Sequence, residues 1–423
     1  MTTAIKTIAP PLARIRVSYD ASRIDDVAAA THTEIAASGV SFAAGERIAI
    51  CCGSRGIANI AEVVRAVVSE CRAAGAEPFI VPAMGSHGGA TAAGQAEVLA
   101  SYGIDEASVD APVHSSMETI ELPSDSLPHR LHMDRYASEA DGIVLINRVK
   151  PHTDFRAPIE SGLLKMAVIG LGKRDQAEIM HSYGVPGLRD MIVPAARELL
   201  RTGRIRLGIG IVENALDETM EIRAMAAETM EQQEMELLEH ARAAMPALPL
   251  DDVDVLVIDE MGKDISGCGI DTNIIGRIRI AGEPEPERPR VRRIVCADLT
   301  SASHGNATGF GLADIITRRL YDKVDFDATY ANIITSTFLE RGMTPLTLPT
   351  DAEAVECALR TCSVRDPSGA RVIRIRNTLQ LSEMWVSPAA WEAIEQQGMP
   401  ATRFGDFVDP FTDDGELLAF DGA

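Results

Sequence analysis

Apolar runs that end in glycine-rich loops, each followed by a helical pattern, recur along the first half of this chain. The predicted strands are 47–51, 78–82, 141–146 and 205–212, and the predicted helices are 57–74 and 91–102. Parallel strands need helical crossovers between them, whereas antiparallel strands can be joined by short turns. The alternation therefore predicts a parallel, doubly wound α/β sheet.

A second region of alternation follows a break at Pro246 and Pro249. Its predicted strands are 254–259, 293–297, 372–376 and 379–386, and its predicted helices are 312–320, 331–342 and 351–361. Before the break, residues 216–245 are predicted to form one long, acid-rich amphipathic helix. The chain of 423 residues is long enough for two domains. We therefore expect two α/β domains with mostly parallel sheets, covering 1–248 and 249–423.

The balance of charge and the cysteine pattern exclude several classes of protein. The net charge of −22 argues against nucleic acids and anionic membrane surfaces as partners, because both select for basic patches. No apolar run is long enough to span a membrane, and residues 1–15 lack the apolar core of a signal peptide. The seven cysteines lack paired spacing, which is typical of free thiols in a reducing cytoplasm. A cytoplasmic location is expected.

Three short motifs follow three of the predicted strands: GSRG at 53–56, GSHGG at 85–89 and KPH at 150–152. In doubly wound sheets, ligands bind at the carboxyl ends of the strands. The motifs would bring Arg55, His87 and His152 to one edge of the sheet. This shared placement predicts a ligand-binding site at that edge.

Each motif alone has a structural and a functional interpretation. Glycine and serine are the usual residues of tight turns, and His152 could be a solvated loop residue. In the functional interpretation, Arg55 binds a carboxylate or phosphate beside a helix N-terminus, and His87 is a general acid/base. Two imidazoles, His87 and His152, on opposite sides of a substrate suit racemisation, because each enantiomer needs its own base.

Lys165 and His181 are the next candidates. Lys165 has apolar flanks in SGLLKMAVIGLGK, so its amine must either reach solvent or do chemistry. His181 follows sixteen residues later on a predicted helix, where a surface histidine near a helix end is the simpler interpretation. The GLGK ending at Lys173 lacks the Ser or Thr and the upstream glycine of a P-loop. In the second domain, the loop 260–277 is rich in Gly, Asp and Asn and is interpreted as a site loop.

Together these residues resemble the nickel-dependent lactate racemase family, most clearly from Arg47 to His181. Members have two α/β domains with the active site in the cleft between them. They carry a nickel-pincer nucleotide (nickel pyridinium-3,5-bisthiocarboxylate mononucleotide), which can be tethered to a lysine. The resemblance implies a small 2-hydroxy acid as substrate and cofactor maturation proteins as partners.

The resemblance also implies a role for each matching residue. Arg55 matches the arginine that binds the substrate carboxylate, His87 and His152 match the two acid/bases, Lys165 matches the tethering lysine, and His181 matches the nickel ligand. Candidate cofactor contacts in the second domain are Lys263, Asn273 and Arg277.

The chain departs from the family pattern at three places. Cys52 stands where the family has an acidic residue, three positions before the arginine. The segment from His152 to Lys165 is longer than the pattern, and SGLLK replaces SGG-x-K. A buried cysteine is usually inert, so Cys52 is not expected to react.

The expected function is that of a racemase or epimerase of a 2-hydroxy acid. It would act by reversible hydride transfer to the nickel-pincer nucleotide, with His87 and His152 moving the hydroxyl proton. One alternative is a hydrolase or lyase that binds a simple divalent metal through these histidines. The other is a non-catalytic protein that binds an organic anion or a nucleotide.

Overall fold

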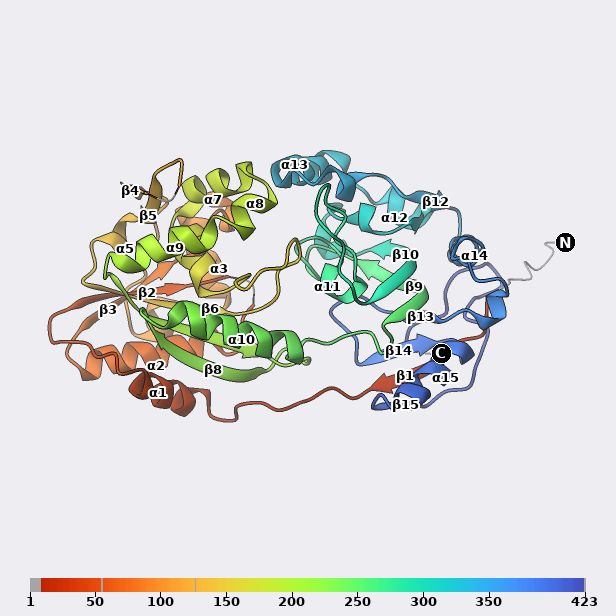
Figure 1. Ribbon diagram of the computed structural model, residues 1–423, viewed down its shortest axis with the longest axis horizontal. Helices are drawn as coiled ribbons and strands as arrows, with labels where there is room; N and C mark the ends of the chain where they lie inside the picture. Colours follow the sequence, from red (N-terminus) through yellow and green to blue (C-terminus); the bar gives the residue numbers. More distant parts are fainter. Residues whose placement is uncertain (1–8, 55, 126, 422–423) are drawn as a thin grey trace. The chain divides into compact units, whose positions relative to one another are not determined.

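A computed structural model of the protein, shown in Figure 1, describes residues 9–54, 56–125 and 127–421. The chain divides into two compact units. The first unit is Asp20–Met245, and the second is Pro246–Ala423 together with the segment that ends at Tyr19. The boundary between the units falls at Pro246, close to the predicted break. The N-terminal segment was expected in the first unit, but it belongs to the second. The reason is that β1 (Ala13–Val17) pairs antiparallel with strands of the second unit's sheet.

The first unit contains a five-stranded sheet in the order β3-β2-β6-β7-β8. Its strands are β2 (Arg47–Cys52), β3 (Glu77–Pro82), β6 (Gly142–Arg148), β7 (Ile205–Glu213) and β8 (Thr219–Ala226). The first four are parallel, and β8 is antiparallel to β7. These four strands match the four that the sequence predicts, and they confirm the predicted α/β class.

The prediction of one long helix over 216–245 is wrong. Its first part is the edge strand β8, and only α10 (Met230–Ala244) is helical. Within β8, the buried Ile222 and Ala224 alternate with the more exposed Glu221 and Arg223. This period of two is that of a half-buried strand, and pairing with β7 overrides the helical propensity of the acidic and alanine residues.

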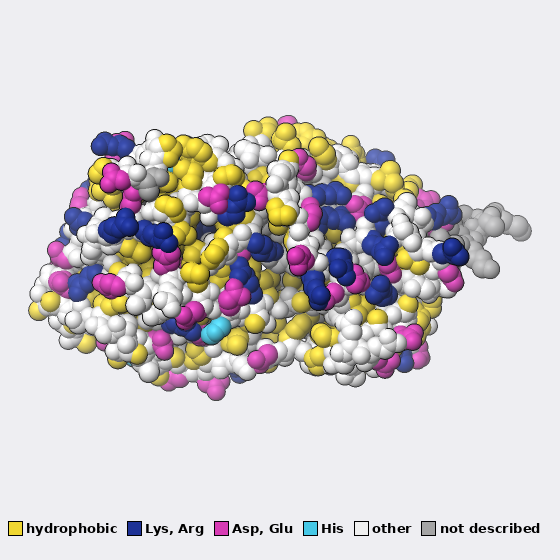
Figure 2. All heavy atoms as spheres, viewed as in Figure 1, with side chains coloured by type: hydrophobic (Ala, Val, Ile, Leu, Met, Phe, Trp, Pro, Cys, Tyr) yellow, Lys and Arg dark blue, Asp and Glu magenta, His cyan; other side chains and the backbone are white. Residues whose placement is uncertain are grey.

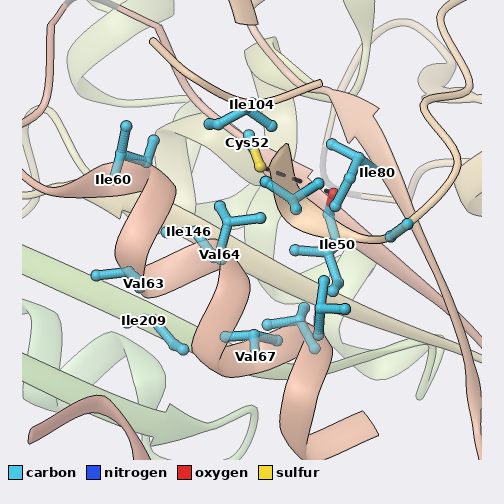
Figure 3. Close-up of a cluster of buried hydrophobic side chains, with 14 of the residues drawn as sticks. Ile50, Cys52, Ile60, Val63, Val64, Val67, Ile80, Ile104, Ile146 and Ile209 are labelled. Carbon is cyan, nitrogen blue, oxygen red and sulfur yellow. Dashed lines mark hydrogen bonds between the residues drawn. The ribbon is translucent and has the colours of Figure 1, made fainter. Parts of the chain in front are cut away.

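The sheet of the first unit is covered on both faces. On one face lie α1 (Val27–Ser38) and α2 (Ile60–Ala73), and Figure 3 shows Val64 and Val67 of α2 beside Ile50 and Cys52 of β2. On the other face lies α10. A β-carbon placed on Gly210 of β7 would meet Leu237 of that helix at 2.5 Å. Burial raises the pKa of the Cys52 thiol to about 12, so this cysteine stays an uncharged thiol, as expected.

Shorter elements complete the first unit. They are α3 (Ala92–Ser101), α4 (Glu106–Val109), β4 (Thr119–Leu122), β5 (Leu131–Asp134), α5 (Arg135–Ser138), α6 (Leu163–Lys165), the π-helical turn η2 (Met166–Gly170), α7 (Lys173–Ser182), α8 (Val185–Arg189) and α9 (Ile192–Arg201). The segment from α6 to α7 is continuous with the loop that follows β6, and it carries Lys165 and His181. It therefore determines where these two side chains lie.

The second unit contains an eight-stranded sheet in the order β12-β11-β10-β9-β13-β14-β1-β15. The first five strands in this order are parallel to one another, and each of the last three is antiparallel to the strand before it. Its strands besides β1 are β9 (Asp252–Met261), β10 (Arg290–Leu299), β11 (Ile315–Thr317), β12 (Leu346–Leu348), β13 (Val372–Ile375), β14 (Glu383–Val386) and β15 (Ala401–Arg403). Its main helices are α11 (Thr272–Ile275), α12 (Arg318–Asp322), α13 (Phe326–Ser336), α14 (Asp351–Thr361) and α15 (Pro388–Gln397).

One predicted helix of the second unit is wrong in its first part. Residues 312–320 include the strand β11, in which Ile315 and Ile316 pair in parallel with β10. Both side chains are buried, and only the last residues of the predicted helix belong to α12, which begins at Arg318. A short apolar run has the same pattern in a helix and in a strand, so pairing with a neighbouring strand determines which of the two forms.

The surface carries charges of both signs. Figure 2 shows Lys and Arg side chains interspersed with Asp and Glu side chains over the face drawn. All seven cysteines, which lie within the described residues, are free thiols, as the sequence predicts. In the parts of the chain that the structure describes, no helix has both the length and the apolar composition needed to cross a bilayer.

Candidate functional site

The three motifs lie at the carboxyl ends of adjacent strands. The GSRG loop follows β2, and β2 lies between β3 and β6 in the sheet. The GSHGG loop after β3 and the KPH loop after β6 therefore flank it on its two sides. Neighbouring strands are about 4.8 Å apart, so the two outer loops begin roughly 10 Å from each other. Arg55 lies outside the described residues, and its substrate-binding role stays a prediction.

His87 lies beside the GSRG loop. Its Nδ1 is 2.5 Å from Oγ of Ser54, which joins the loops after β2 and β3. Gly88 follows with φ +63°, and a β-carbon there would come within 2.6 Å of backbone atoms at the start of α3. The glycine after the histidine is thus required both by its backbone conformation and by the close approach of the helix.

His152 lies in the loop after β6 and contacts Lys165 directly. Its Nε2 is 2.6 Å from Nζ of Lys165, and its Nδ1 accepts the backbone N–H of Asp154 at 3.1 Å. The ring is nearly buried and stacks on Phe155, with 4.5 Å between the ring centroids. An imidazole and an amine at this distance can exchange a proton. The structure therefore brings one predicted acid/base and the predicted tethering lysine together.

His181 is influenced electrostatically by Lys165. It lies in the last turn of α7, and its pKa is lowered from the usual value by burial and then by the positive charge of Lys165, while Asp154 opposes the shift. A lowered pKa keeps the imidazole neutral at pH 7, with a nitrogen lone pair available for a metal. His152 and Lys165 are in direct contact, and the charge of Lys165 acts on His181; we call these three residues the amine–imidazole cluster.

The loop that carries His152 is anchored by a buried carboxylate that the sequence interpretation missed. Glu160 accepts the backbone N–H of His152 at 2.6 Å and that of Ala157 at 3.0 Å. Its Oε1 also accepts Nη2 of Arg242 on α10 at 2.7 Å. The segment between His152 and Lys165, longer than the family pattern, is therefore held in place by an ion pair between the buried Glu160 and the partly exposed Arg242 near the end of α10.

A second buried acid on α10 fixes the turn that carries Lys165. Oε2 of Glu234 accepts the backbone N–H of Leu164 at 2.9 Å, at the start of α6. Gly162 provides no side-chain cap there, and a β-carbon on it would lie 2.0 Å from Oε1 of Glu234. Burial raises the pKa of Glu234 to about 8, so the carboxyl is mostly protonated at pH 7. The carboxyl of Glu234 therefore takes the place of the missing helix cap.

One sequence signal points to Glu234. On α10 it falls on the stripe formed by the buried Met230, Leu237, Leu238 and Ala241. An acid on an apolar helix stripe is rarely buried without a partner. By contrast, no signal identifies the partner of Glu160, because Arg242 is far away in the sequence.

The second-unit candidates make contacts of their own. Arg277 donates to Asp314 Oδ2 at 2.9 Å and to the carbonyl of Leu312 at 2.9 Å, which ties α11 to the segment before β11. The side chain of Asn273 donates to Asp271 at 2.8 Å, and Nζ of Lys263 donates to Oδ1 of Asn332. The roles of Lys263, Asn273 and Arg277 in holding a cofactor stay predictions.

The described residues contain no complete set of protein ligands for a metal ion. Among residues 9–54, 56–125 and 127–421, no group of three or more His, Cys, Asp and Glu side chains is placed to hold a metal ion. In the amine–imidazole cluster, the neutral imidazole of His181 is a suitable single donor.

Comparison with known proteins gives a family and a distant structural likeness. No curated protein matches the sequence. The solved structures include the lactate racemase apoprotein from Thermoanaerobacterium thermosaccharolyticum, which is similar with a TM-score of 0.49 and 12% sequence identity, over 87% of this chain and 99% of that chain. The model of a family described as a domain of unknown function, DUF362, matches residues 53–268, about half of the chain. The protein therefore belongs to the DUF362 family.

Proposed function

We propose that the protein is a racemase or epimerase of a small 2-hydroxy acid, and that Lys165 and His181 hold a nickel-pincer nucleotide in it. The observation that carries the proposal is the amine–imidazole cluster. Nζ of Lys165 lies 2.6 Å from Nε2 of His152, and the charge of Lys165 also acts on His181. A candidate acid/base thus contacts an amine that could form a covalent bond, and the charge of that amine acts on a candidate imidazole ligand, which supports the proposal.

The residues present fit such a cofactor by the chemistry of their donors. A metal that arrives within an organic group brings most of its ligands with it, so one imidazole from the protein is sufficient. His181 would supply that imidazole, and the amine of Lys165 would be a suitable nucleophile for the tether. When bound, the cofactor would accept a hydride from C2 of the substrate and return it.

The protein's own residues would move the hydroxyl proton. The C2 hydrogen of a 2-hydroxy acid is a poor acid, so its removal as a proton is difficult, whereas the hydroxyl proton moves easily to an imidazole. His87 and His152 belong to loops on the two sides of the β2 loop, which supports one imidazole on each side of the substrate. Each imidazole would serve one enantiomer, taking the hydroxyl proton on one face and returning it on the other. Arg55 would hold the carboxylate.

The cofactor part of the proposal is tested by intact mass and bound nickel. The protein is produced together with the cofactor's maturation proteins, as the wild type, as Lys165→Ala and as Lys323→Ala. Lys323 is a matched control because it is a partly exposed lysine, paired with Asp298, in the other unit. We expect a mononucleotide-sized adduct and near-stoichiometric nickel in the wild type and in Lys323→Ala, and no adduct in Lys165→Ala.

Two results would contradict the proposal. A wild-type protein with neither adduct nor nickel would exclude the tethered cofactor. Nickel bound without an organic adduct, equally in all three proteins, would favour the hydrolase or lyase with a simple metal.

A further inference from the structure

Lys173, the last residue of GLGK, is fully buried at the start of α7. Its Nζ lies 3.1 Å from Oδ2 of Asp134, and neither side chain has any solvent-exposed surface. Its backbone has φ +53°, in the left-handed region that few residues other than glycine adopt. A buried charge and a strained backbone are both costly, and they persist only where the surrounding structure requires them.

The amine of Lys173 also contacts the end of β3 and a buried glutamine of α3. It donates to the carbonyl of Pro82 and, at 3.2 Å, to Oε1 of Gln95. Nε2 of Gln95 in turn donates to the carbonyls of Gly85 at 2.8 Å and His87 at 3.2 Å. The side chains therefore form a continuous chain of contacts from Asp134 through Lys173 and Gln95 to the backbone of the GSHGG loop.

We propose that Lys173 and Gln95 are positioning residues that fix the imidazole of His87 relative to the helix that carries His181. The chain of contacts passes through Lys173, the first residue of α7, and ends at the backbone carbonyl of His87. The imidazole of His87 is held at its other end by Ser54, 2.5 Å from Nδ1. With the backbone fixed by Gln95 and the ring by Ser54, the direction of the imidazole is determined.

The chemistry of the contacts argues for positioning beyond the filling of space. The carbonyl oxygen of Gln95 accepts from Lys173, and its amide nitrogen donates to the two loop carbonyls. Leucine would fill a similar volume, but it would leave these buried partners without their hydrogen bonds. Glutamate would keep the acceptor for Lys173 and lose both donations to the loop. The two substitutions therefore separate the contact with Lys173 from the contacts with the loop.

The test compares Gln95→Leu, Gln95→Glu and the control Gln176→Leu. Gln176 is also fully buried, and its Oε1 accepts the backbone N–H of His132 on β5 at 2.9 Å. The control removes a buried amide close to Lys173 in the sequence, and the hydrogen bond of this amide goes to β5 and not to the GSHGG loop. Gln95→Glu keeps a partner for Lys173 and so preserves folding if Gln95→Leu does not.

Two readouts report on His87 without the cofactor. They are the NMR shift and titration of its Cε1–H, and its rate of modification by diethyl pyrocarbonate, located by peptide mass. We expect both Gln95 variants to shift the His87 resonance and to change its modification rate about fivefold, the factor that one hydrogen bond represents, and Gln176→Leu to leave both unchanged. An unchanged His87 in Gln95→Glu, or equal changes in Gln95→Glu and Gln176→Leu, would overturn the proposal.

Only the catalytic importance of this positioning rests on the proposed function. In the nickel-loaded enzyme, Gln95→Glu is expected to lower kcat and to leave KM nearly unchanged, because His87 would act on the proton and not on binding. If no 2-hydroxy acid is racemised but His87 still responds to Gln95→Glu, the proposed function fails and the positioning role holds. If racemisation occurs and His87 does not respond, the positioning role fails alone.

Discussion

Replacing His152 by Gln is expected to lower kcat for the interconversion of 2-hydroxy acid enantiomers by about 10²–10⁴-fold, the usual contribution of a general acid/base. Glutamine can keep a hydrogen bond to Nζ of Lys165, which lies 2.6 Å from Nε2 in the wild type, but it cannot take up a proton. KM should change little. The same result is expected for His87→Gln, because each imidazole would serve one face of the substrate.

Single-turnover experiments with each pure enantiomer distinguish a two-base mechanism from a general loss of structure. His152→Gln and His87→Gln should each still oxidise one enantiomer to the 2-oxo acid, and not the same one. His132→Gln is the matched control, since His132 lies on β5 and contacts Thr119 away from the three loops. If both variants keep kcat within about tenfold of the wild type, the histidines are not the acid/bases.

Replacing Glu234 by Gln is expected to make the protein more stable than the wild type above pH 8. Burial raises the folded-state pKa of Glu234 from 4.5 to about 8, so between these values the folded protein holds a proton that the unfolded chain releases. The contribution of this proton to the free energy of unfolding is fully present below pH 4.5. It is lost as the pH rises to about 8, at about 1.4 kcal/mol per pH unit. Glutamine keeps an acceptor for the N–H of Leu164 and does not titrate.

Urea unfolding at pH 6 and pH 9 measures this effect as the difference between the two proteins. The free energy of unfolding of the wild type should fall relative to Glu234→Gln between these values. Glu231→Gln serves as a control on the same helix, because the pKa of Glu231 is lowered by its hydrogen bond with Arg197 and it stays ionised at both pH values. Parallel stability curves for wild type and Glu234→Gln would show that Glu234 is ionised in the folded protein.

The sequence predicts the parts of the first unit that depend on local patterns. The four parallel strands have continuous apolar runs, and the loops that follow them carry the glycines and histidines of the motifs. The position of a loop at the carboxyl end of a parallel strand follows from the fold class. The approach of Lys165 to His152 could be expected from this placement together with the family resemblance, although the contact itself could not.

Other features depend on contacts between residues that are distant in the sequence. Pairing with β7 determines that the edge segment β8 is a strand, since its own composition is compatible with a helix. The ion pair between Glu160 and Arg242 brings together a loop and a helix that no local pattern relates. Likewise, GLGK fails as a phosphate-binding motif, and only the fold reveals that Lys173 is paired with Asp134. Buried polar networks of this kind have no periodic signature in the sequence.

The most direct test of the proposed reaction is the fate of deuterium at C2. The nickel-loaded protein is incubated in ordinary water with a panel of enantiomerically pure 2-deuterated 2-hydroxy acids, from lactate to longer acids, and the products are resolved by chiral chromatography and mass. The proposal predicts that at least one acid is converted to its other enantiomer and that the deuterium remains at C2, because it moves as a hydride and does not exchange with water. Conversion with loss of the deuterium to solvent, or no conversion by protein that carries both nickel and adduct, would contradict it.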